Sequence, residues 1–154
     1  MIKSIWIFAL SAIGIFVIDQ NIKALFIEGY SYYGECISFI LTYNKGVAFS
    51  MFSFLGNNLK YIQSILLAGV GVYIILRKDL FIKYSLPLGI LFGAGSSNIF
   101  DRFIHGGVVD YVYWHCGFKF AIFNFADVMI DLSVIIILFI TYKHSIINWT
   151  LKKR

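Results

Sequence analysis

Four long runs of apolar residues, separated by short polar segments, divide the chain. They cover residues of about 4–26, 58–76, 84–102 and 120–142. Each run is long enough, or nearly so with its flanking residues, to cross a hydrocarbon core of about 30 Å as a helix. Backbone groups in lipid must bond to one another, so the pattern predicts four transmembrane helices. At 154 residues the chain is expected to form one transmembrane domain over residues 1–154.

The first run admits a second interpretation, a cleavable signal peptide, because Lys3 precedes its apolar stretch. No small-x-small cleavage site follows, however. Asp19 and Gln20 come next, and the segment continues apolar to Phe26. A retained helix is therefore favoured.

Composition supports a membrane protein. Hydrophobic residues make up 60% of the chain, charged residues 14%, and the mean hydropathy is +0.82. A water-soluble domain of this size has no room to bury so much apolar surface. The net charge of +5 raises nucleic-acid binding as an alternative. The basic residues form no stripe with interleaved aromatic residues, so we expect no nucleic-acid partner.

The distribution of basic residues gives the orientation. Of the 13 basic residues, eight fall before the first run, between the second and third runs, or after the fourth. They are Lys3, Arg77, Lys78, Lys83, Lys143, Lys152, Lys153 and Arg154. Positive charge favours the cytoplasmic side, so both termini are expected in the cytoplasm.

Two segments then face outward, about 28–57 and about 103–119. Part of the first, SFILTYNKGVAFSMF, alternates well enough to form short strands. We therefore expect an all-α membrane protein with four transmembrane helices and a small extracytoplasmic β-sheet over residues 28–57, beside an outer loop over 103–119. Pro87 is expected in the first turn of the third helix, where its missing N–H does no harm.

Polar residues gather where the runs end on the outer side. Ionisable groups at membrane depth are costly, and randomly scattered ones would not converge on one depth. The converging residues are Asp19, Lys23, Asn98, Arg102, Asn124, Asp127 and, in the outer loop, Asp110. Two carboxylates brought together can share a proton, and such a pair can activate water and protonate a leaving group. Asp110 and Asp127 are therefore candidates for an aspartic pair that hydrolyses a peptide bond.

Several of these residues also have purely structural interpretations. Asp19 and Lys23, four apart on one helix face, can form a neutralised pair that only fastens the first helix. For Asp101 we favour an ion pair with its neighbour Arg102 at the helix end. The planar fork of Arg102 suits a carboxylate or a lipid phosphate. Asp131, one turn beyond Asp127, either repels Asp127 or is neutral and hydrogen-bonded.

Amides and small residues have an equally ordinary role. Asn98 and Asn124 can satisfy backbone groups or join helices. The stretch GAGSSN, residues 93–98, is more typical of close helix packing than of ligand binding. Cys36 and Cys116 both fall outside the membrane on the same side, and two unpaired thiols are favoured over a disulfide. The three histidines, His105, His115 and His144, show no i,i+4 spacing, so no metal site is expected.

Five short motifs, in order, resemble those of the signal peptidase II family, the bacterial lipoprotein signal peptidases. The family's DQxxK, NxGxAF, NxxDR, GxVxD and FNxAD boxes match residues 19–23, 44–49, 98–102, 106–110 and 123–127. Each box alone is weak, but five in order across four apolar runs are specific. Ser96 occupies a position that is usually apolar in the family, and Asp131 belongs to none of the motifs.

The resemblance implies an activity. The family removes the signal peptide from prolipoproteins whose lipobox cysteine carries a diacylglyceryl group, with the residues at Asp110 and Asp127 as the catalytic pair. Further residues would bind substrate or support the site: Asp19, Lys23, Asn44, Gly46, Asn98, Arg102 and Asn124. No metal or other cofactor is expected. The expected partners are diacylated prolipoprotein signal peptides and membrane lipids, and the protein is expected to be a monomer.

This implies a multi-pass protein of the bacterial cytoplasmic membrane with its site near the outer face. Two other functions stay open. Asp19, Asp127 and Asp131 would serve as a proton relay in a small proton-coupled transporter. Transport predicts charges near the midplane and repeat symmetry, which this chain lacks. A non-catalytic chaperone for lipoproteins would tolerate loss of both aspartates of the pair.

Overall fold

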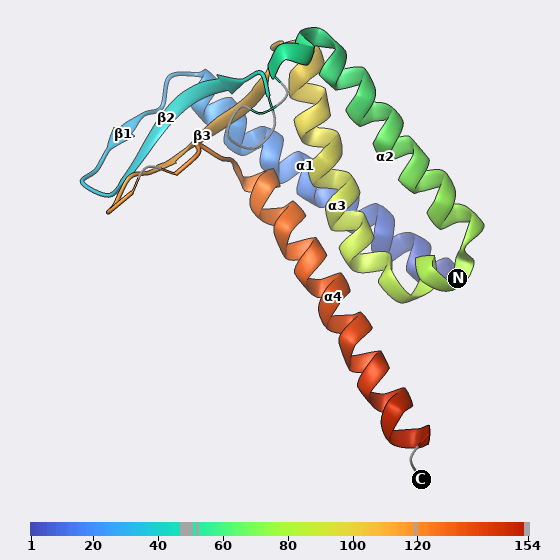
Figure 1. Ribbon diagram of the computed structural model, residues 1–154. Helices are drawn as coiled ribbons and strands as arrows, with labels where there is room; N and C mark the ends of the chain where they lie inside the picture. The colour runs from blue at the N-terminus through green and yellow to red at the C-terminus, as the bar shows by residue number, and fades with distance from the viewer. Residues whose placement is uncertain (47–50, 52, 119, 153–154) are drawn as a thin grey trace.

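The computed structural model describes residues 1–46, 51, 53–118 and 120–152, without the side chains of residues 53 and 144–152. Four helices and a small sheet make up this part of the chain (Figure 1). The helices are α1 (Ile2–Ile27), α2 (Leu59–Leu76), α3 (Lys78–Ile104) and α4 (Phe125–Lys152), with a short 3-10 helix η2 (Ser53–Asn58) before α2. The strands are β1 (Tyr32–Tyr33), β2 (Ile37–Asn44) and β3 (Val108–Trp114).

Helix α3 packs against α1, α2 and α4. Its glycines allow α1 to come close. A β-carbon on Gly89 would lie 2.5 Å from the carbonyl oxygen of Phe8, and one on Gly93 would lie 2.3 Å from that of Ala12. The prediction of close helix packing by the small-residue stretch is therefore confirmed at Gly93.

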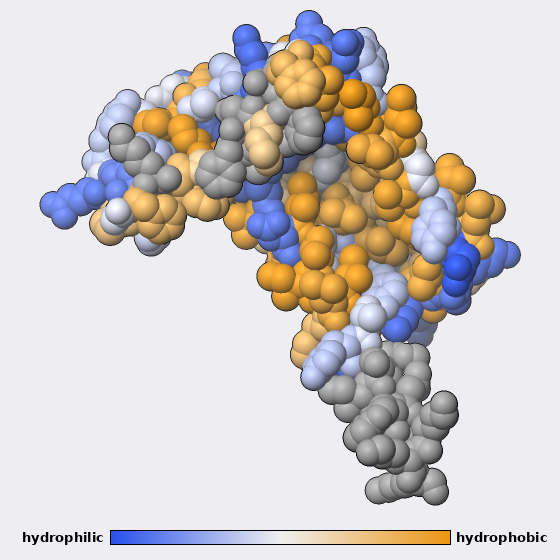
Figure 2. All heavy atoms as spheres, viewed as in Figure 1, coloured by the Kyte–Doolittle hydropathy of each residue, from blue (hydrophilic) through white to orange (hydrophobic). Residues whose placement is uncertain are grey.

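Three helical segments are long and apolar enough to cross a membrane among the described residues. They are Ile2–Ile27, Phe54–Leu76 and Phe125–Lys143, and each exposes large hydrophobic side chains. Figure 2 shows such side chains gathered over the helices on one face of the molecule. Helix α3 is long enough but more polar, because much of its surface meets other helices and not lipid. Membrane-spanning helices are thus present, whereas the predicted fourth span, 84–102, stays a prediction.

The β-sheet is antiparallel with strand order β1-β2-β3. Strand β3 comes from the segment that we predicted as an outer loop, 103–119, so that prediction was wrong in part. It pairs with both ends of β2, with Ile37 opposite Trp114 and Asn44 opposite Val108, and the register shifts between Phe39 and Thr42. Among the described residues of 28–57, β1 and β2 are the strands, and Ser53–Asn58 forms the 3-10 helix.

Two predicted helix starts also differ from the structure. The fourth helix begins at Phe125 and not at 120, because Phe123 is extended and bridges to Val112 of β3. The third begins at Lys78 and not at 84, but its backbone leaves helical geometry at Tyr84 (φ −115°, ψ 18°). Pro87 therefore does sit in the first turn after a break, where its missing N–H leaves no hydrogen bond unmade.

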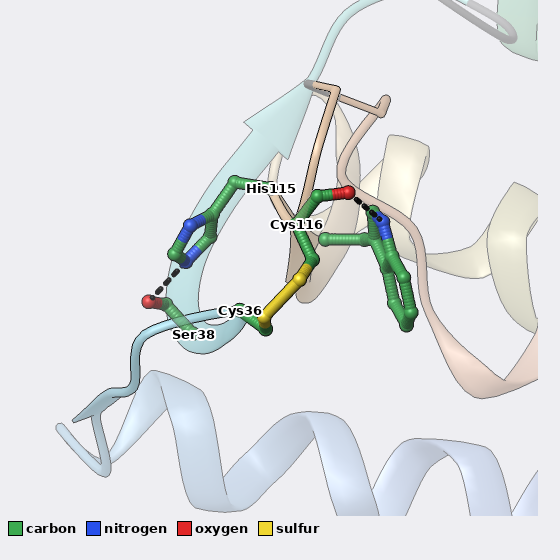
Figure 3. Close-up of a disulfide and its surroundings, with 5 residues drawn as sticks. Cys36, Ser38, His115 and Cys116 are labelled. Carbon is green, nitrogen blue, oxygen red and sulfur yellow. Dashed lines mark hydrogen bonds between the residues drawn. A yellow bond between two sulfur atoms is a disulfide. The ribbon is translucent and has the colours of Figure 1, made fainter.

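Cys36 and Cys116 form a disulfide (Figure 3), so the expectation of two free thiols was wrong. The pairing follows from the strand register. Cys36 precedes Ile37 of β2, Cys116 follows the end of β3, and the N–H of His115 donates to the Cys36 carbonyl at 2.9 Å. The sequence did not predict β3, and without it nothing brings the two cysteines together. A disulfide is typical of an oxidising compartment, which agrees with an extracytoplasmic sheet.

Removing this cross-link should destabilise the protein. The disulfide joins residues 80 apart in the sequence, and native disulfides typically contribute about 2–4 kcal/mol. For the double variant Cys36→Ser/Cys116→Ser we expect a Tm about 5–10 °C lower in detergent. Dithiothreitol should lower the Tm of the original protein similarly and leave the variant unchanged. Two alkylatable thiols in the non-reduced protein would contradict the disulfide.

Candidate active site

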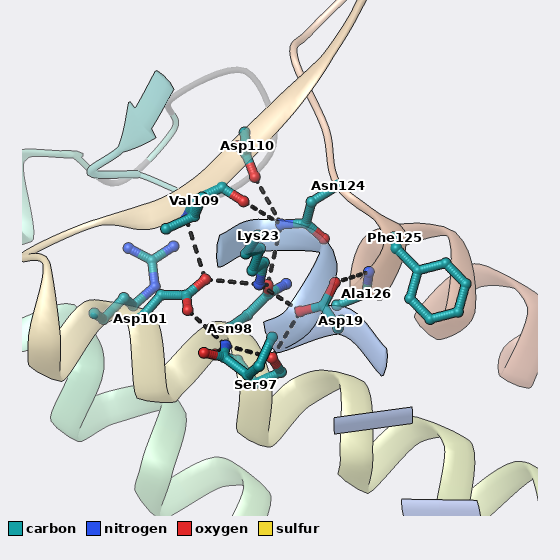
Figure 4. A network of polar contacts seen from close by, with 12 residues as sticks. Asp19, Lys23, Ser97, Asn98, Asp101, Val109, Asp110, Asn124, Phe125 and Ala126 are labelled. Atoms are coloured by element: carbon teal, nitrogen blue, oxygen red, sulfur yellow. Dashed lines mark hydrogen bonds and ion pairs between the residues drawn. The ribbon is translucent and has the colours of Figure 1, made fainter. Parts of the chain in front are cut away.

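A buried cluster of three charges lies where α1, α3 and β3 meet (Figure 4). Lys23 Nζ lies 2.6 Å from Asp19 Oδ2 and 2.6 Å from Asp101 Oδ2, and all three side chains are at most 1% exposed. The Lys23 ammonium also donates to Asn98 Oδ1 at 2.8 Å. The predicted pair of Asp19 and Lys23 is confirmed. The predicted ion pair of Asp101 with Arg102 was wrong, because the Asp101 carboxylate turns inward to Lys23.

The two carboxylates of this cluster hold the elements that follow. Asp19 Oδ1 accepts a hydrogen bond from the N–H of Ala126, in the first turn of α4, at 2.9 Å. Its other oxygen accepts from the Ser97 hydroxyl at 2.6 Å. Asp101 Oδ2 accepts from the N–H of Val109 in β3 at 3.1 Å. The charge cluster therefore fixes the positions of α4 and β3, the two elements that carry Asp127 and Asp110.

Asn124 links those two aspartates. Its side-chain amide donates to Asp110 Oδ1 at 2.7 Å. Its backbone N–H donates to Asp127 Oδ2 at 3.1 Å, and its side-chain oxygen accepts from the N–H of Asp127 at 2.9 Å. This reciprocal pair is a capping box, formed by an Asn and an Asp three residues apart at the start of α4. The same local geometry that begins the helix therefore orients both carboxylates.

A further asparagine donates to each carboxylate. The Asn44 side-chain amide, at the end of β2, donates to Asp110 Oδ2 at 3.0 Å. The Asn98 amide, on α3, donates to Asp127 Oδ1 at 2.9 Å. Each aspartate is thus held by donors from two elements, so its carboxylate has little freedom to rotate.

Burial changes the protonation of Asp110. Its side chain is 1% exposed, and loss of hydration raises its pKa to about 7, with a further contribution from the negative charge of Asp127. The amides of Asn44 and Asn124 act in the opposite direction, because they stabilise the charged form. A carboxyl group with this pKa can hold or release a proton near neutral pH.

Both aspartates border a cavity of about 680 Å³ between α2, α3 and α4. Its walls towards the bilayer interior are apolar and include Leu67, Val70 and Leu91. Most of the polar groups on its surface therefore lie at one end, near the sheet, and Asp131 lies one turn of α4 deeper. Such a cavity suits an apolar ligand that presents one polar segment to the carboxylates.

A family model for signal peptidase (SPase) II matches residues 11–143. The chain belongs to the signal peptidase II family. A lipoprotein signal peptidase of Sulfurimonas denitrificans is 58% identical over 142 residues, which cover 92% of this chain and 92% of the relative. One of Wolinella succinogenes is 54% identical over 142 residues, covering 92% and 94%.

A solved structure described as a bacterial membrane enzyme, obtained by the in meso method at 2.3 Å resolution, also matches. Its TM-score is 0.75 at 25% sequence identity, and the match covers 94% of this chain and 90% of that chain. The protein is therefore a bacterial membrane protein of a peptidase family, as the motifs indicated.

The structure of this signal peptidase II family member joins the nine residues that the sequence selected into one series of contacts. From Asp19 the contacts run through Lys23 to Asn98, and from there to Asp127. They continue through Asn124 to Asp110 and then to Asn44. Gly46 donates its N–H to Asn44 Oδ1 at 2.9 Å, and Arg102 binds the Gly46 carbonyl. Among the described residues, no three His, Cys, Asp or Glu side chains are grouped to hold a metal ion.

Three residues of this network were not selected as site residues from the sequence. Asp101 is the second carboxylate on Lys23, and Ser97 binds Asp19. The Gln20 amide donates to both, to Ser97 Oγ and to Asp101 Oδ1, at 2.8 Å each. Gln20 and Asp101 lie inside the DQxxK and NxxDR boxes, so the motif letters themselves were the signal that pointed to them.

Among the described residues, the Arg102 guanidinium forms no hydrogen bond with a carboxylate. Its guanidinium donates to the backbone carbonyls of Gly46 and, at 3.4 Å, of Asn44. The turn after β2 therefore rests on the planar fork of Arg102, and this turn carries the Asn44 side chain to Asp110.

Replacing the Arg102 guanidinium with an ammonium group should lower the activity without abolishing it. In Arg102→Lys a single ammonium replaces two N–H donors, so the turn at Asn44 loosens and we expect a peptidase activity about tenfold lower. Cleavage rates of a lipidated precursor measure the effect. The matched control is Arg77→Lys, at an exposed arginine that bonds only Asp79 among the described residues. Full activity of Arg102→Lys would show that a point charge suffices.

Proposed function

We propose that the protein is an aspartic endopeptidase that removes the signal peptide from diacylglyceryl-modified prolipoproteins, cleaving before the lipidated cysteine. The observation that carries the proposal is the meeting of Asp110 and Asp127 on one asparagine, at the polar end of an apolar cavity. Lipoprotein signal peptidases are the relatives of this chain, and their name supports the choice of substrate.

In the proposed reaction the two aspartates share one proton. The ionised carboxylate removes a proton from a water molecule, and the resulting hydroxide attacks the scissile carbonyl. The protonated carboxyl group donates a hydrogen bond to that carbonyl and its proton then passes to the departing amine. Asn124 keeps the carboxylates at a fixed separation, while Asn44 and Asn98 hold their outer oxygens.

The cavity supplies the place for the substrate. The apolar signal sequence would occupy the space between α2 and α4, and the acyl chains of its lipid would remain in the bilayer. In this arrangement α3 is the fourth transmembrane helix, and both termini lie in the cytoplasm. The termini lie at the end of the helices away from the sheet (Figure 1), which agrees with a site near the outer face.

Activity should depend on pH through the shared proton. The pKa of Asp110, raised to about 7, keeps this carboxyl group protonated below neutral pH. As the pH rises above about 7 the pair loses that proton, so kcat/KM should fall, approaching about tenfold per pH unit. A rate profile from pH 5 to 9 checks this. A rate that keeps rising to pH 9 would contradict a required proton near pH 7.

The pKa of Asp110 also affects stability, with a defined sign. A raised pKa means that the folded state binds the proton more tightly than the unfolded state does. Its contribution is therefore complete below about pH 4 and is lost as the pH rises to about 7. Asp110→Asn should remove this part of the pH dependence of Tm.

One assay tests the function itself. Purified protein is incubated with a diacylated precursor and with the same precursor lacking the lipid, both in the presence of a chelator. We expect release of the signal peptide from the diacylated form and little or none from the other. No release from the diacylated form would end the proposal. Proton flux into vesicles would instead support a transporter.

A further inference from the structure

We infer that Gln63, on α2, positions the main chain of the substrate opposite the aspartic pair by accepting a hydrogen bond from a backbone N–H beside the scissile bond. The inference rests on the proposed peptidase function and adds a residue that lies outside all five sequence motifs. It places a polar contact on the α2 side of the cavity, across from the carboxylates carried by β3 and α4.

The packing of α2 on α3 sets the depth of Gln63. The rings of Tyr61 and Phe103 are in edge contact, with centroids 5.8 Å apart. Further along α2, a side-chain carbon of Leu67 lies 3.7 Å from the place that a β-carbon on Gly95 of α3 would occupy. The two helices run in opposite directions, so Gln63 faces α3 between Phe103 and Gly95.

This register brings Gln63 to the level of the catalytic pair. Halfway between the two contacts lies Ile99, which borders the same cavity as Gln63. Its neighbour Asn98 donates to Asp127 at 2.9 Å. One residue advances a helix by about 1.5 Å, so Gln63 lies within about one turn of the depth of Asp127.

The carbonyl oxygen of Gln63 is buried and has no hydrogen-bond partner among the described residues. The other α2 residues on the cavity wall are Leu66, Leu67 and Val70, which continue its helix face inward and are apolar. A buried acceptor without a partner is unfavourable in the free protein. A ligand that brings an N–H to this wall satisfies it once the Gln63 side chain turns its oxygen towards the cavity that it lines, with the backbone of α2 unchanged.

A peptide about to be cleaved brings such a donor. The bond must leave helical geometry to be reached by water, and its neighbouring N–H groups then lose their internal partners. At membrane depth an unpaired N–H is costly, so an acceptor there favours the extended, cleavable form. The amides of Asn44, Asn98 and Asn124 already bind the two carboxylates. Gln63 supplies an acceptor on the opposite wall. The apolar side chains further along α2, Leu66, Leu67 and Val70, suit the apolar part of the signal sequence.

The test combines a variant with an altered substrate. Gln63→Met keeps the length of the side chain and removes the acceptor. The altered substrates are diacylated precursors with an ester in place of one amide on either side of the scissile bond, each lacking one N–H. We expect Gln63→Met to lower kcat/KM for the amide substrate about tenfold. For the original protein, one of the two ester substrates should show a kcat/KM about tenfold lower than that of the amide substrate. For Gln63→Met, that ester and the amide should have the same kcat/KM.

Ser64→Ala is the matched control, because the Ser64 hydroxyl bonds only to the Lys60 carbonyl of its own helix in the described residues. It should leave kcat/KM unchanged. The Tm of Gln63→Met should equal or exceed that of the original protein, since the Gln63 carbonyl oxygen makes no hydrogen bond among the described residues that the substitution could remove. An unchanged kcat/KM in Gln63→Met would overturn the inference while the peptidase function stood. So would a result in which the loss from Gln63→Met and the loss from the ester multiply for both ester substrates. Failure of the original protein to cleave any precursor would instead overturn both.

Discussion

Asp110→Asn and Asp127→Asn should each lower signal-peptide release by about 10²–10⁴-fold while the protein still folds. Asparagine keeps the size of the side chain and an oxygen for the hydrogen bond from Asn124 or Asn98. It can neither remove a proton from water nor donate one to the departing amine. The loss should therefore appear in kcat and not in KM, as expected for groups that act in the transition state.

The double variant Asp110→Asn/Asp127→Asn tests whether the two aspartates act together or independently. If the carboxylates work on one water molecule, removing the second should cost far less than removing the first. Asp79→Asn is the matched control, since Asp79 is exposed in the first turn of α3, far along the chain from the site. Near-normal cleavage by either single variant would refute the assignment. A lipoprotein chaperone would tolerate both substitutions, so the same proteins decide that alternative.

The sequence was informative about the helices and about which residues meet at the candidate site. Long apolar runs have few alternatives to membrane helices, and the motif boxes selected residues that do meet in one network. The sequence could not show the partners within that network. Arg102 stands beside Asp101 in the chain, yet the carboxylate turns inward to Lys23 and the guanidinium binds the turn at Gly46. Such choices depend on how α1 packs against α3.

The sheet explains most of the remaining errors. Strand β3 is seven residues long and gains its stability from pairing with β2, a contact between segments far apart in the sequence. Such pairing leaves a weak local signal. Without β3 the disulfide of Cys36 with Cys116 and the contact of Asn44 with Asp110 are both invisible. The start of α4 moved for the same reason, because Phe123 pairs with Val112.

Lys23→Met should have the largest effect on stability. The Lys23 ammonium is the common partner of Asp19 and Asp101, and its side chain is 1% exposed. Methionine fills a similar volume but leaves two buried carboxylates without a counter-charge. Breaking one partner of a buried ion pair typically costs about 3–5 kcal/mol, a large part of the total stability of about 5–15 kcal/mol. We expect a Tm about 10–20 °C lower in detergent, or little folded protein.

Two further proteins test whether uncompensated charge is the cause. Lys3→Met, at an exposed lysine of the same helix, should leave the Tm within about 2 °C. Lys23→Met combined with Asp19→Asn and Asp101→Asn removes all three charges and should regain much of the lost stability, because neutral amides keep hydrogen bonds to Ala126 and Val109 within reach. A triple variant no more stable than Lys23→Met would assign the loss to packing. A Lys23→Met protein with the original Tm would show that the cluster does not hold α4 and β3 in place.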